Sequence, residues 1–139
     1  MAKQCVFCDI INKDRVASIV FENDFLISFM DKYPLNRVHL LVVPKQHYQY
    51  LTDMENKDVA QLFEIVNMLS KHVWKTVNAD GLNITQSNGL AASQDIFHVH
   101  IHIIPRFIND TDNDSWPSRK VTTDQELDNL ASQIKSLLN

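Results

Sequence analysis

Three histidines at alternate positions, in the segment His98-Val99-His100-Ile101-His102, constrain the fold of this chain more than any other feature. In a β-strand successive side chains point to opposite faces, so the three imidazoles would share one face. Val99 and Ile101 would share the other face and pack against a core. Buried ring nitrogens need hydrogen-bond partners, which makes three imidazoles on one face costly as plain core. The pattern therefore predicts a strand with a functional face.

Five short segments rich in apolar residues predict β-strands, and they are residues 18–22, 25–30, 38–43, 82–86 and 97–104. Asn23-Asp24 supplies a turn between the first two segments, which predicts a hairpin. Pro44 and Pro105 are expected to end the third and fifth strands. Because the early connections have hairpin length, we expect an antiparallel sheet of about five strands rather than a parallel one.

Two stretches with apolar residues at helical spacing predict helices. The long one follows Thr52 and Glu55, which have capping-box spacing, and Gly81 suits the left-handed position after it. The second follows another capping box at Thr123 and Glu126. The predicted fold class is therefore α+β, with one long helix packed on the sheet and a second helix at the C-terminus.

Charge and composition limit the partners and the compartment. A net charge of -4 argues against duplex nucleic acid, which needs a basic stripe. A mononucleotide stays compatible, because backbone N–H groups can hold a phosphate. We expect no membrane span and a cytoplasmic protein, since there is neither an 18-residue apolar run nor a signal-peptide pattern. In a reducing compartment the two cysteines, Cys5 and Cys8, favour a metal or redox pair over a disulfide.

Two uses of the three histidines compete. Imidazoles bind zinc, copper or iron, but three alternate residues on a strand span about 13 Å, so chelation of one metal by this strand alone is strained. In the second use the histidines have separate roles. One is a nucleophile, a second donates a proton or hydrogen bond to a phosphate or leaving group, and the third serves structure.

The segment from His98 to Ile104 resembles the His-φ-His-φ-His-φ-φ signature of the histidine-triad (HIT) family. Further motifs stand in the expected order over about residues 5–107, and they are Cys5-x-x-Cys8, Asp31, Val42-Val43-Pro44-Lys45-x-His47, Asn88-Gly89, Gln94 and Pro105-Arg106. The chain is most similar to the bacterial-type branch that resembles the Hint proteins. The resemblance implies a single HIT domain over residues 1–139, with a core at 5–107 and a C-terminal extension at 108–139.

The resemblance also implies an activity. Family members hydrolyse or transfer nucleotides at the α-phosphate of purine nucleoside phosphoramidates or dinucleoside polyphosphates. His100 occupies the nucleophile position and would form a covalent nucleotidyl-histidine, which water would hydrolyse. His102 would face the phosphate and assist the leaving group. The alternative is a nucleotide-binding regulatory protein with little physiological catalysis. Relatives form homodimers through the long helix and a sheet edge, so a homodimer is expected.

Residues around the histidines are expected to hold the nucleotide. Asp31 matches the acidic residue that binds the ribose hydroxyls, although before Tyr33-Pro34 it also suits a turn. Ile10 and Phe29 are candidates for packing the base. A loop of small residues would offer backbone N–H groups to the phosphate, and Gln94 could orient the phosphate or the attacking water. The binding residues expected in this loop are Ser87, Asn88, Gln94, Asp95 and Ile96.

Three positions of this loop depart from the family pattern. Ser87 stands where many relatives have Asn, and Ser93 stands where a Gly commonly precedes the Gln. Asp95 replaces a Ser or Thr. An acidic side chain near the phosphate should repel it unless it points away, so Asp95 is expected to contribute its backbone N–H.

A structural zinc is the last expectation. Cys5 and Cys8 have zinc-ligand spacing, but two ligands do not close a tetrahedral site. Zinc-bearing relatives add the histidine after the Pro-Lys motif and the first histidine of the triad, which here are His47 and His98. The resemblance thus implies a Cys₂His₂ zinc, with a free dithiol or a metal-free site as the alternative.

Overall fold

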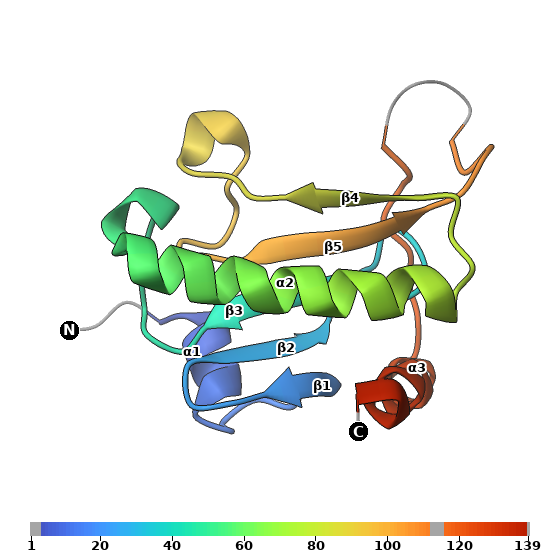
Figure 1. Ribbon diagram of the computed structural model, residues 1–139, viewed down its shortest axis with the longest axis horizontal. Helices are drawn as coiled ribbons and strands as arrows, with labels where there is room; N and C mark the ends of the chain where they lie inside the picture. The colour runs from blue at the N-terminus through green and yellow to red at the C-terminus, as the bar shows by residue number, and fades with distance from the viewer. Residues whose placement is uncertain (1–3, 112–115, 139) are drawn as a thin grey trace.

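The computed structural model describes residues 4–111 and 116–138, and it shows helices around one antiparallel sheet (Figure 1). The sheet has five strands in the order β1-β2-β3-β5-β4, and every neighbouring pair is antiparallel. This confirms the predicted α+β class. The elements are α1 (Val6–Ile11), β1 (Ile19–Glu22), β2 (Leu26–Met30), β3 (Leu40–Pro44), η1 (Leu51–Asp53), α2 (Asn56–Thr76), β4 (Gly81–Thr85), η2 (Leu90–Ala92), β5 (Ile101–Arg106) and α3 (Asp124–Leu138).

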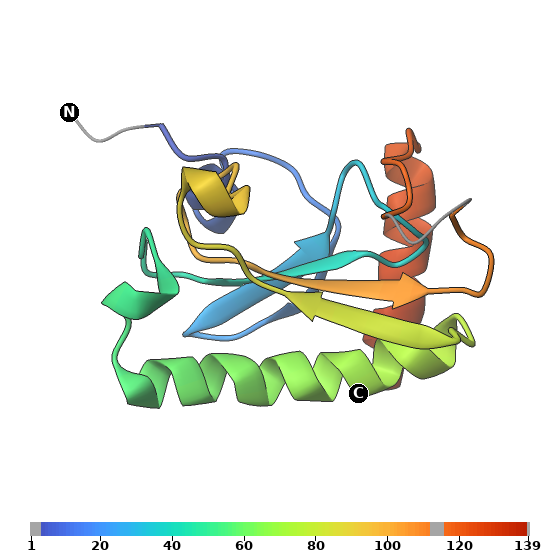
Figure 2. The same ribbon diagram turned by 90° about the horizontal axis from the view of Figure 1, so that it is seen from above.

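The two faces of the sheet are covered by different elements. Helix α2 runs along one face, α1 and η2 lie over the other, and α3 stands at one end of the sheet (Figure 2). Strand alternation separates two cores: Leu40 and Val42 of β3 pack on the α2 side, and Leu41 and Val43 pack on the α1 side. No helix in the described part of the chain is long and apolar enough to cross a membrane.

Strand β5 differs from the predicted segment at both ends. It begins at Ile101, so His98 and His100 lie just before the strand, where the N–H of Val99 bonds to the carbonyl of Tyr48 at 2.8 Å. At the other end Pro105 lies inside the strand instead of ending it. The β3–β5 ladder stops at Ile103. Pro105 therefore has no β3 residue opposite it that would need a backbone N–H donor.

The ends of α2 also differ from prediction. The capping box at Thr52 and Glu55 is wrong, because Glu55 is itself the N-cap residue and η1 occupies the turn before it. After the helix, Asn78 takes the left-handed conformation with φ of 52°, while Gly81 begins β4. Asn tolerates that conformation because its short polar side chain can bond locally.

The cap of α3 agrees with prediction in part. The hydroxyl oxygen of Thr123 accepts a hydrogen bond from the N–H of Glu126 at 3.1 Å, as an N-cap residue should. The Glu126 carboxylate, however, accepts from the Thr122 hydroxyl at 2.7 Å instead of closing the reciprocal half of the box. From this cap α3 buries Leu127, Leu130 and other apolar residues in the core on the α2 side.

Candidate active site

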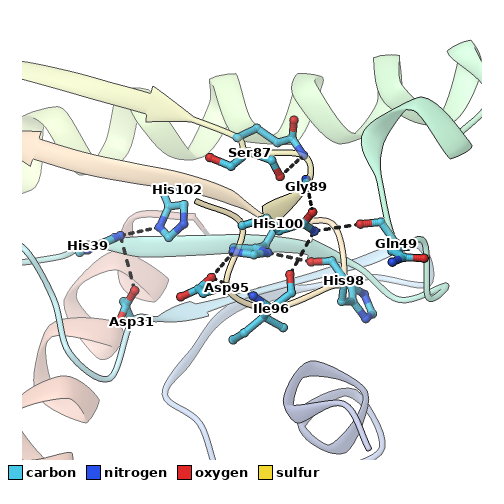
Figure 3. Close-up of polar contacts among 12 residues, drawn as sticks. Asp31, His39, Gln49, Ser87, Gly89, Asp95, Ile96, His98, His100 and His102 are labelled. Atoms are coloured by element: carbon cyan, nitrogen blue, oxygen red, sulfur yellow. Dashed lines mark hydrogen bonds and ion pairs between the residues drawn. The ribbon is translucent and has the colours of Figure 1, made fainter. Parts of the chain in front are cut away.

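The three histidines lie on the α1 side of the sheet, as strand alternation predicts (Figure 3). The Phe7 ring of α1 is 5.9 Å from the His98 ring and 5.0 Å from the His100 ring, between centroids. The rings of His100 and His102 are 5.1 Å apart. Val99 and Ile101 are fully buried in the core on the opposite side. One short segment therefore carries both core and a row of imidazoles.

Hydrogen bonding fixes which nitrogen of His100 is free. Its Nδ1 lies 2.7 Å from the backbone carbonyl oxygen of His98. A carbonyl only accepts, so Nδ1 carries the proton and Nε2 of the neutral ring keeps its lone pair. That Nε2 lies 3.7 Å from a carboxylate oxygen of Asp95. In its neutral form the His100 ring therefore presents the Nε2 lone pair toward the pocket, and a neutral imidazole nitrogen is a competent nucleophile.

The orientation of His102 depends on His39, a residue that the sequence reasoning missed. The N–H of Leu35 donates to Nδ1 of His39 at 3.0 Å, so the proton of a neutral His39 is on Nε2. That Nε2 lies 2.9 Å from Nδ1 of His102 and donates to it. His102 consequently carries its own proton on Nε2, as a hydrogen-bond donor. A lone histidine in the apolar strand 38–43 was the signal that could have found this partner.

Burial keeps both of these rings neutral. It lowers the pKa of His39 from 6.5 to about 3, against the smaller opposing effect of the Asp31 carboxylate. It also lowers the pKa of His102 to about 4, and the nearby His100 adds to that shift. At neutral pH His102 therefore acts as a neutral N–H donor rather than as an imidazolium.

The small-residue loop is held by its own side chains. Gln94 is buried, and its amide accepts from the Gly89 N–H at 2.7 Å and donates to the carbonyls of Gln49 and Ile96. All three bonds join the Gln94 side chain to the backbone, which supports a role in shaping the loop. Asn88 accepts from the Leu51 N–H at 2.8 Å, away from the histidines. The side chains of Asn88 and Gln94 thus support the loop.

Asp95 does not point away from the reacting position. One oxygen of its carboxylate accepts the Ile96 N–H at 2.9 Å, and that same oxygen is the one 3.7 Å from Nε2 of His100. The side chain is 67% exposed. The expectation of a carboxylate directed elsewhere is wrong, because the bond to the next residue's N–H turns it toward the histidine (Figure 3).

A pocket of about 590 Å³ opens beside the histidines, a volume suited to a small ligand. It brings together seven of the residues expected at the site, which are Ile10, Phe29, Asp31, Asp95, Ile96, His100 and His102. Ser87, Asn88 and Gln94 are not among its lining residues. The apolar part beside α1 and the polar part beside the histidines give it the mixed lining typical of a nucleotide site.

The C-terminal extension supplies one wall of this pocket, which no sequence signal indicated. Arg119 donates to the Asp31 carboxylate at 3.1 Å and to the Tyr33 carbonyl at 2.7 Å. Asp31 also accepts the Tyr33 N–H at 2.9 Å, so it makes the turn and still faces the pocket. Ligand atoms of Asp31, His39 and His102 lie within 4.8 Å of one another. The His39–His102 bond and the Arg119 cation already engage those atoms, which disfavours a metal there.

The four expected zinc ligands meet at the N-terminal end of α1. Their ligand atoms lie within 4.8 Å of one another. Nδ1 of His98 is 3.5 Å from the Cys5 sulfur and 3.6 Å from the Cys8 sulfur, and Nδ1 of His47 is 3.3 Å from the Cys8 sulfur. A tetrahedral zinc holds sulfur and nitrogen ligands about 3.6 Å apart, by its usual bond lengths. The donor set and its spacing therefore fit zinc.

The second nitrogen of His98 supports the same conclusion. Nε2 of His98 donates to the Pro44 carbonyl at 2.8 Å, so the lone pair is on Nδ1, the atom that faces the two sulfurs. Burial, followed by the neighbouring Cys5, raises the pKa of the Cys8 thiol to about 11 in the absence of a cation. A bound cation would reverse that preference, because metal binding displaces thiol protons.

Comparison with known proteins agrees with this geometry. The HIT domain family model matches residues 12–109. The chain is 36% identical to adenylylsulfatase HINT3 of Arabidopsis thaliana, over 98% of this chain and 68% of that one. It is 30% identical to adenosine 5'-monophosphoramidase hnt1 of Schizosaccharomyces pombe, over 95% and 96%. The chain belongs to the HIT family, whose members here include nucleotide hydrolases.

Solved structures show the same fold. A hypothetical histidine triad nucleotide-binding protein from Sulfolobus tokodaii superposes with a TM-score of 0.86 at 34% identity, over 95% of this chain and 90% of that one. A zinc-bound histidine triad family protein from Mycobacterium smegmatis gives 0.80 at 31% identity, over 96% and 94%. The Cys₂His₂ cluster can therefore hold a metal, and one structural neighbour contains zinc.

Proposed function

We propose that this protein is a nucleotide hydrolase or nucleotidyl transferase that attacks the α-phosphate of a purine nucleotide through His100. The observation that carries the proposal is the bond from Nδ1 of His100 to the His98 carbonyl, which makes Nε2, beside the pocket, the nitrogen that holds the lone pair of the neutral ring. The substrates are purine nucleoside phosphoramidates or dinucleoside polyphosphates. The two named relatives, an adenylylsulfatase and an adenosine monophosphoramidase, support adenosine nucleotides.

The reaction takes two displacements. The lone pair of His100 Nε2 forms a bond to phosphorus while the bond from phosphorus to the leaving group breaks. The neutral N–H of His102 donates a hydrogen bond to a phosphoryl oxygen, where charge accumulates. Water then attacks the phosphorus, the bond to His100 breaks, and a nucleoside monophosphate leaves. His39 acts on His102 by holding its tautomer.

The lining of the pocket supports a nucleoside as the bound group. Ile10 of α1 and Phe29 of β2 would pack the base, since both are buried and line the pocket. Asp31 would bind the ribose hydroxyls with its carboxylate. The backbone N–H of Asp95 would lie near the phosphate, while the Ile96 N–H would stay on the Asp95 carboxylate. Ser87, Asn88 and Gln94 would act through the loop's shape. Residues 1–139 would form one domain, because α3 packs into the α2-side core.

Zinc would have a structural role. Bound by Cys5, Cys8, His47 and His98, it would fasten the start of α1 to the histidine segment. The free thiols of these cysteines suit a reducing compartment, so a cytoplasmic location is proposed. Metal analysis of the purified protein should find one zinc per chain in the wild type and none in Cys8→Ser. A wild type without zinc would contradict this role.

A homodimer is proposed from the surface of α2 and β4. Phe63 and Trp74 on α2 and Ile84 on β4 are exposed apolar side chains on the described surface. Apolar side chains on an exposed helix and on the edge strand β4 are suited to pairing with a second copy. Light scattering should give the mass of two chains; a monomer mass at micromolar concentration would contradict the proposal.

The proposed activity is tested with His100→Ala. This variant should release no AMP from an adenosine phosphoramidate while it still binds AMP, because the base and ribose contacts stay in place. His72→Ala, on α2, is the matched control and should turn over substrate like the wild type. Unchanged turnover by His100→Ala would refute the nucleophile. Turnover that is absent even in the wild type, with AMP still bound, would favour the regulatory binding protein.

A further inference from the structure

Asp95 places a carboxylate next to the atom that is proposed to attack phosphorus. Its Oδ1 lies 3.7 Å from Nε2 of His100, and the Ile96 N–H at 2.9 Å holds that oxygen in position. A reacting phosphorus has to come within about 3–3.5 Å of its nucleophile. The carboxylate therefore lies within a few ångströms of any phosphoryl group bound for reaction. This holds for every substrate, because the position of the reacting phosphorus is fixed by His100.

No arginine or lysine among the described residues that line the pocket is paired with the Asp95 carboxylate. Arg119 is engaged with Asp31 and the Tyr33 carbonyl. The remaining cations that line the pocket are Arg15 and Lys32, and the structure records no ion pair between either of them and Asp95. The Asp95 carboxylate is 67% exposed and lies beside the pocket, on the side from which a substrate would reach His100.

A negative charge at this place distinguishes substrates by their leaving group. The α-phosphoryl group carries one negative charge in every substrate, and its repulsion by the carboxylate is common to all of them. A sulfate or polyphosphate leaving group adds further negative charge, which the carboxylate repels. An amine joined through a P–N bond adds none, and its N–H can donate a hydrogen bond to the carboxylate.

We propose that Asp95 is a specificity-determining residue that favours phosphoramidates with amine leaving groups over nucleotides with anionic oxygen leaving groups. The proposal rests on the function proposed above and assigns its substrate class. It differs from the expectation for a backbone contact, because the side-chain charge itself makes the selection. A charge that penalises the wrong partner is a common way to obtain specificity.

Loss of an amine leaving group requires a proton on its nitrogen. The phosphoramidate nitrogen takes one proton from solvent, and the Asp95 carboxylate stabilises the resulting N–H cation. Nε2 of His100 then forms its bond to phosphorus, and the P–N bonding pair leaves with the nitrogen as a neutral amine. Water adds to phosphorus, the pair of the histidine bond returns to Nε2, and one proton goes back to solvent from the new phosphate. An oxygen leaving group such as sulfate needs no proton and gains nothing from the carboxylate.

The test compares two substrates in the full-length protein. Asp95→Asn removes the charge but keeps an oxygen that can accept the Ile96 N–H, and its exposure makes misfolding no concern. Asp24→Asn removes the same charge from the β1–β2 turn as a control. The measured quantity is kcat/KM for an adenosine phosphoramidate divided by kcat/KM for adenylyl sulfate. Diadenosine triphosphate serves as a second anionic substrate.

The wild type should favour the phosphoramidate, and Asp95→Asn should lower the ratio by about fivefold, the effect of one unit charge at about 4 Å through a water-like dielectric, which suits an exposed carboxylate. Asp24→Asn should keep the wild-type ratio. A ratio unchanged in Asp95→Asn, with both substrates turned over, overturns the inference alone. Absence of AMP release from every substrate by the wild type overturns the proposed function, and the inference with it.

Discussion

His39 connects the fold to the proposed chemistry, and two substitutions can separate its two hydrogen bonds. The residue is fully buried, accepts from the Leu35 N–H through Nδ1 and donates to His102 through Nε2. An asparagine oxygen can replace the Nδ1 acceptor, and a glutamine amide can replace the Nε2 donor. His39→Asn should therefore keep the bond from the Leu35 N–H and lose the bond to His102. His39→Gln should keep the bond to His102 and lose the bond from the Leu35 N–H.

The magnitudes follow from the groups left without a partner. A buried donor or acceptor that loses its bond costs about 1–3 kcal/mol of stability. Both variants should thus lower the free energy of unfolding by about that amount. Only His39→Asn frees Nδ1 of His102, so that the proton can move there and the donor on Nε2 is lost. The loss of one positioned donor costs about 10²–10³ in kcat. His39→Gln should keep kcat within about tenfold of the wild type.

Urea denaturation followed by circular dichroism measures the stability of both variants, and steady-state AMP release measures kcat. The comparison between two variants of similar stability removes global unfolding as an explanation. Wild-type kcat in His39→Asn, or an equal loss of activity in His39→Gln and His39→Asn, would show that His39 does not set the tautomer of His102.

Three further predictions follow from individual contacts. Ser93 has φ of 68°, so Ser93→Gly should raise the free energy of unfolding by about 1 kcal/mol in urea denaturation, and a decrease would show that the loop needs the serine. Arg119→Ala should raise KM for the nucleotide with little change in kcat, because Asp31 loses the cation that orients it. Arg119→Lys should restore part of the affinity. A fall in kcat alone would contradict this role of Arg119. Between pH 6.5 and 4 the unfolded chain binds protons at His39 and His102 that the folded chain excludes. The contribution of these neutral rings to the free energy of unfolding is therefore fully present above pH 6.5. Below pH 6.5 it falls by up to about 1.4 kcal/mol per pH unit for each ring. Urea denaturation at several pH values that gave a constant free energy would contradict the burial of neutral histidines.

Local periodicity predicted the fold well, because it depends on which side chains are apolar. Alternation in β3 and around His100 placed apolar and polar side chains on the correct faces. The element ends were harder, since they depend on competing local bonds. Asp53 accepts the Tyr50 N–H at 3.1 Å and forms a separate turn before α2, which spacing alone does not reveal. Pro105 is tolerated in β5 because the pairing of β5 with β3 has already ended at Ile103.

The sequence predicted those parts of the site whose residue types have one plausible chemistry. It did not predict the contacts between segments that are far apart along the chain. The Cys-x-x-Cys pair and the spaced histidines indicated both the zinc ligands and the reacting face. Arg119 reaches Asp31 across 88 positions of sequence, and no local pattern encodes that contact. The side-chain direction of Asp95 likewise follows from one backbone bond to Ile96. Such orientations are set by tertiary structure, so sequence reasoning could name the residue and not its role.

Trapping the covalent intermediate tests the proposed role of His100 most directly. The wild-type protein is mixed with an adenosine phosphoramidate, quenched in alkali within milliseconds to seconds, digested and examined by mass spectrometry. We expect an adenylyl group on His100 and none on His98 or His102, with no adduct in His100→Ala. An adenylyl group on another residue, or rapid AMP release without any nucleotidylated histidine, would contradict this role.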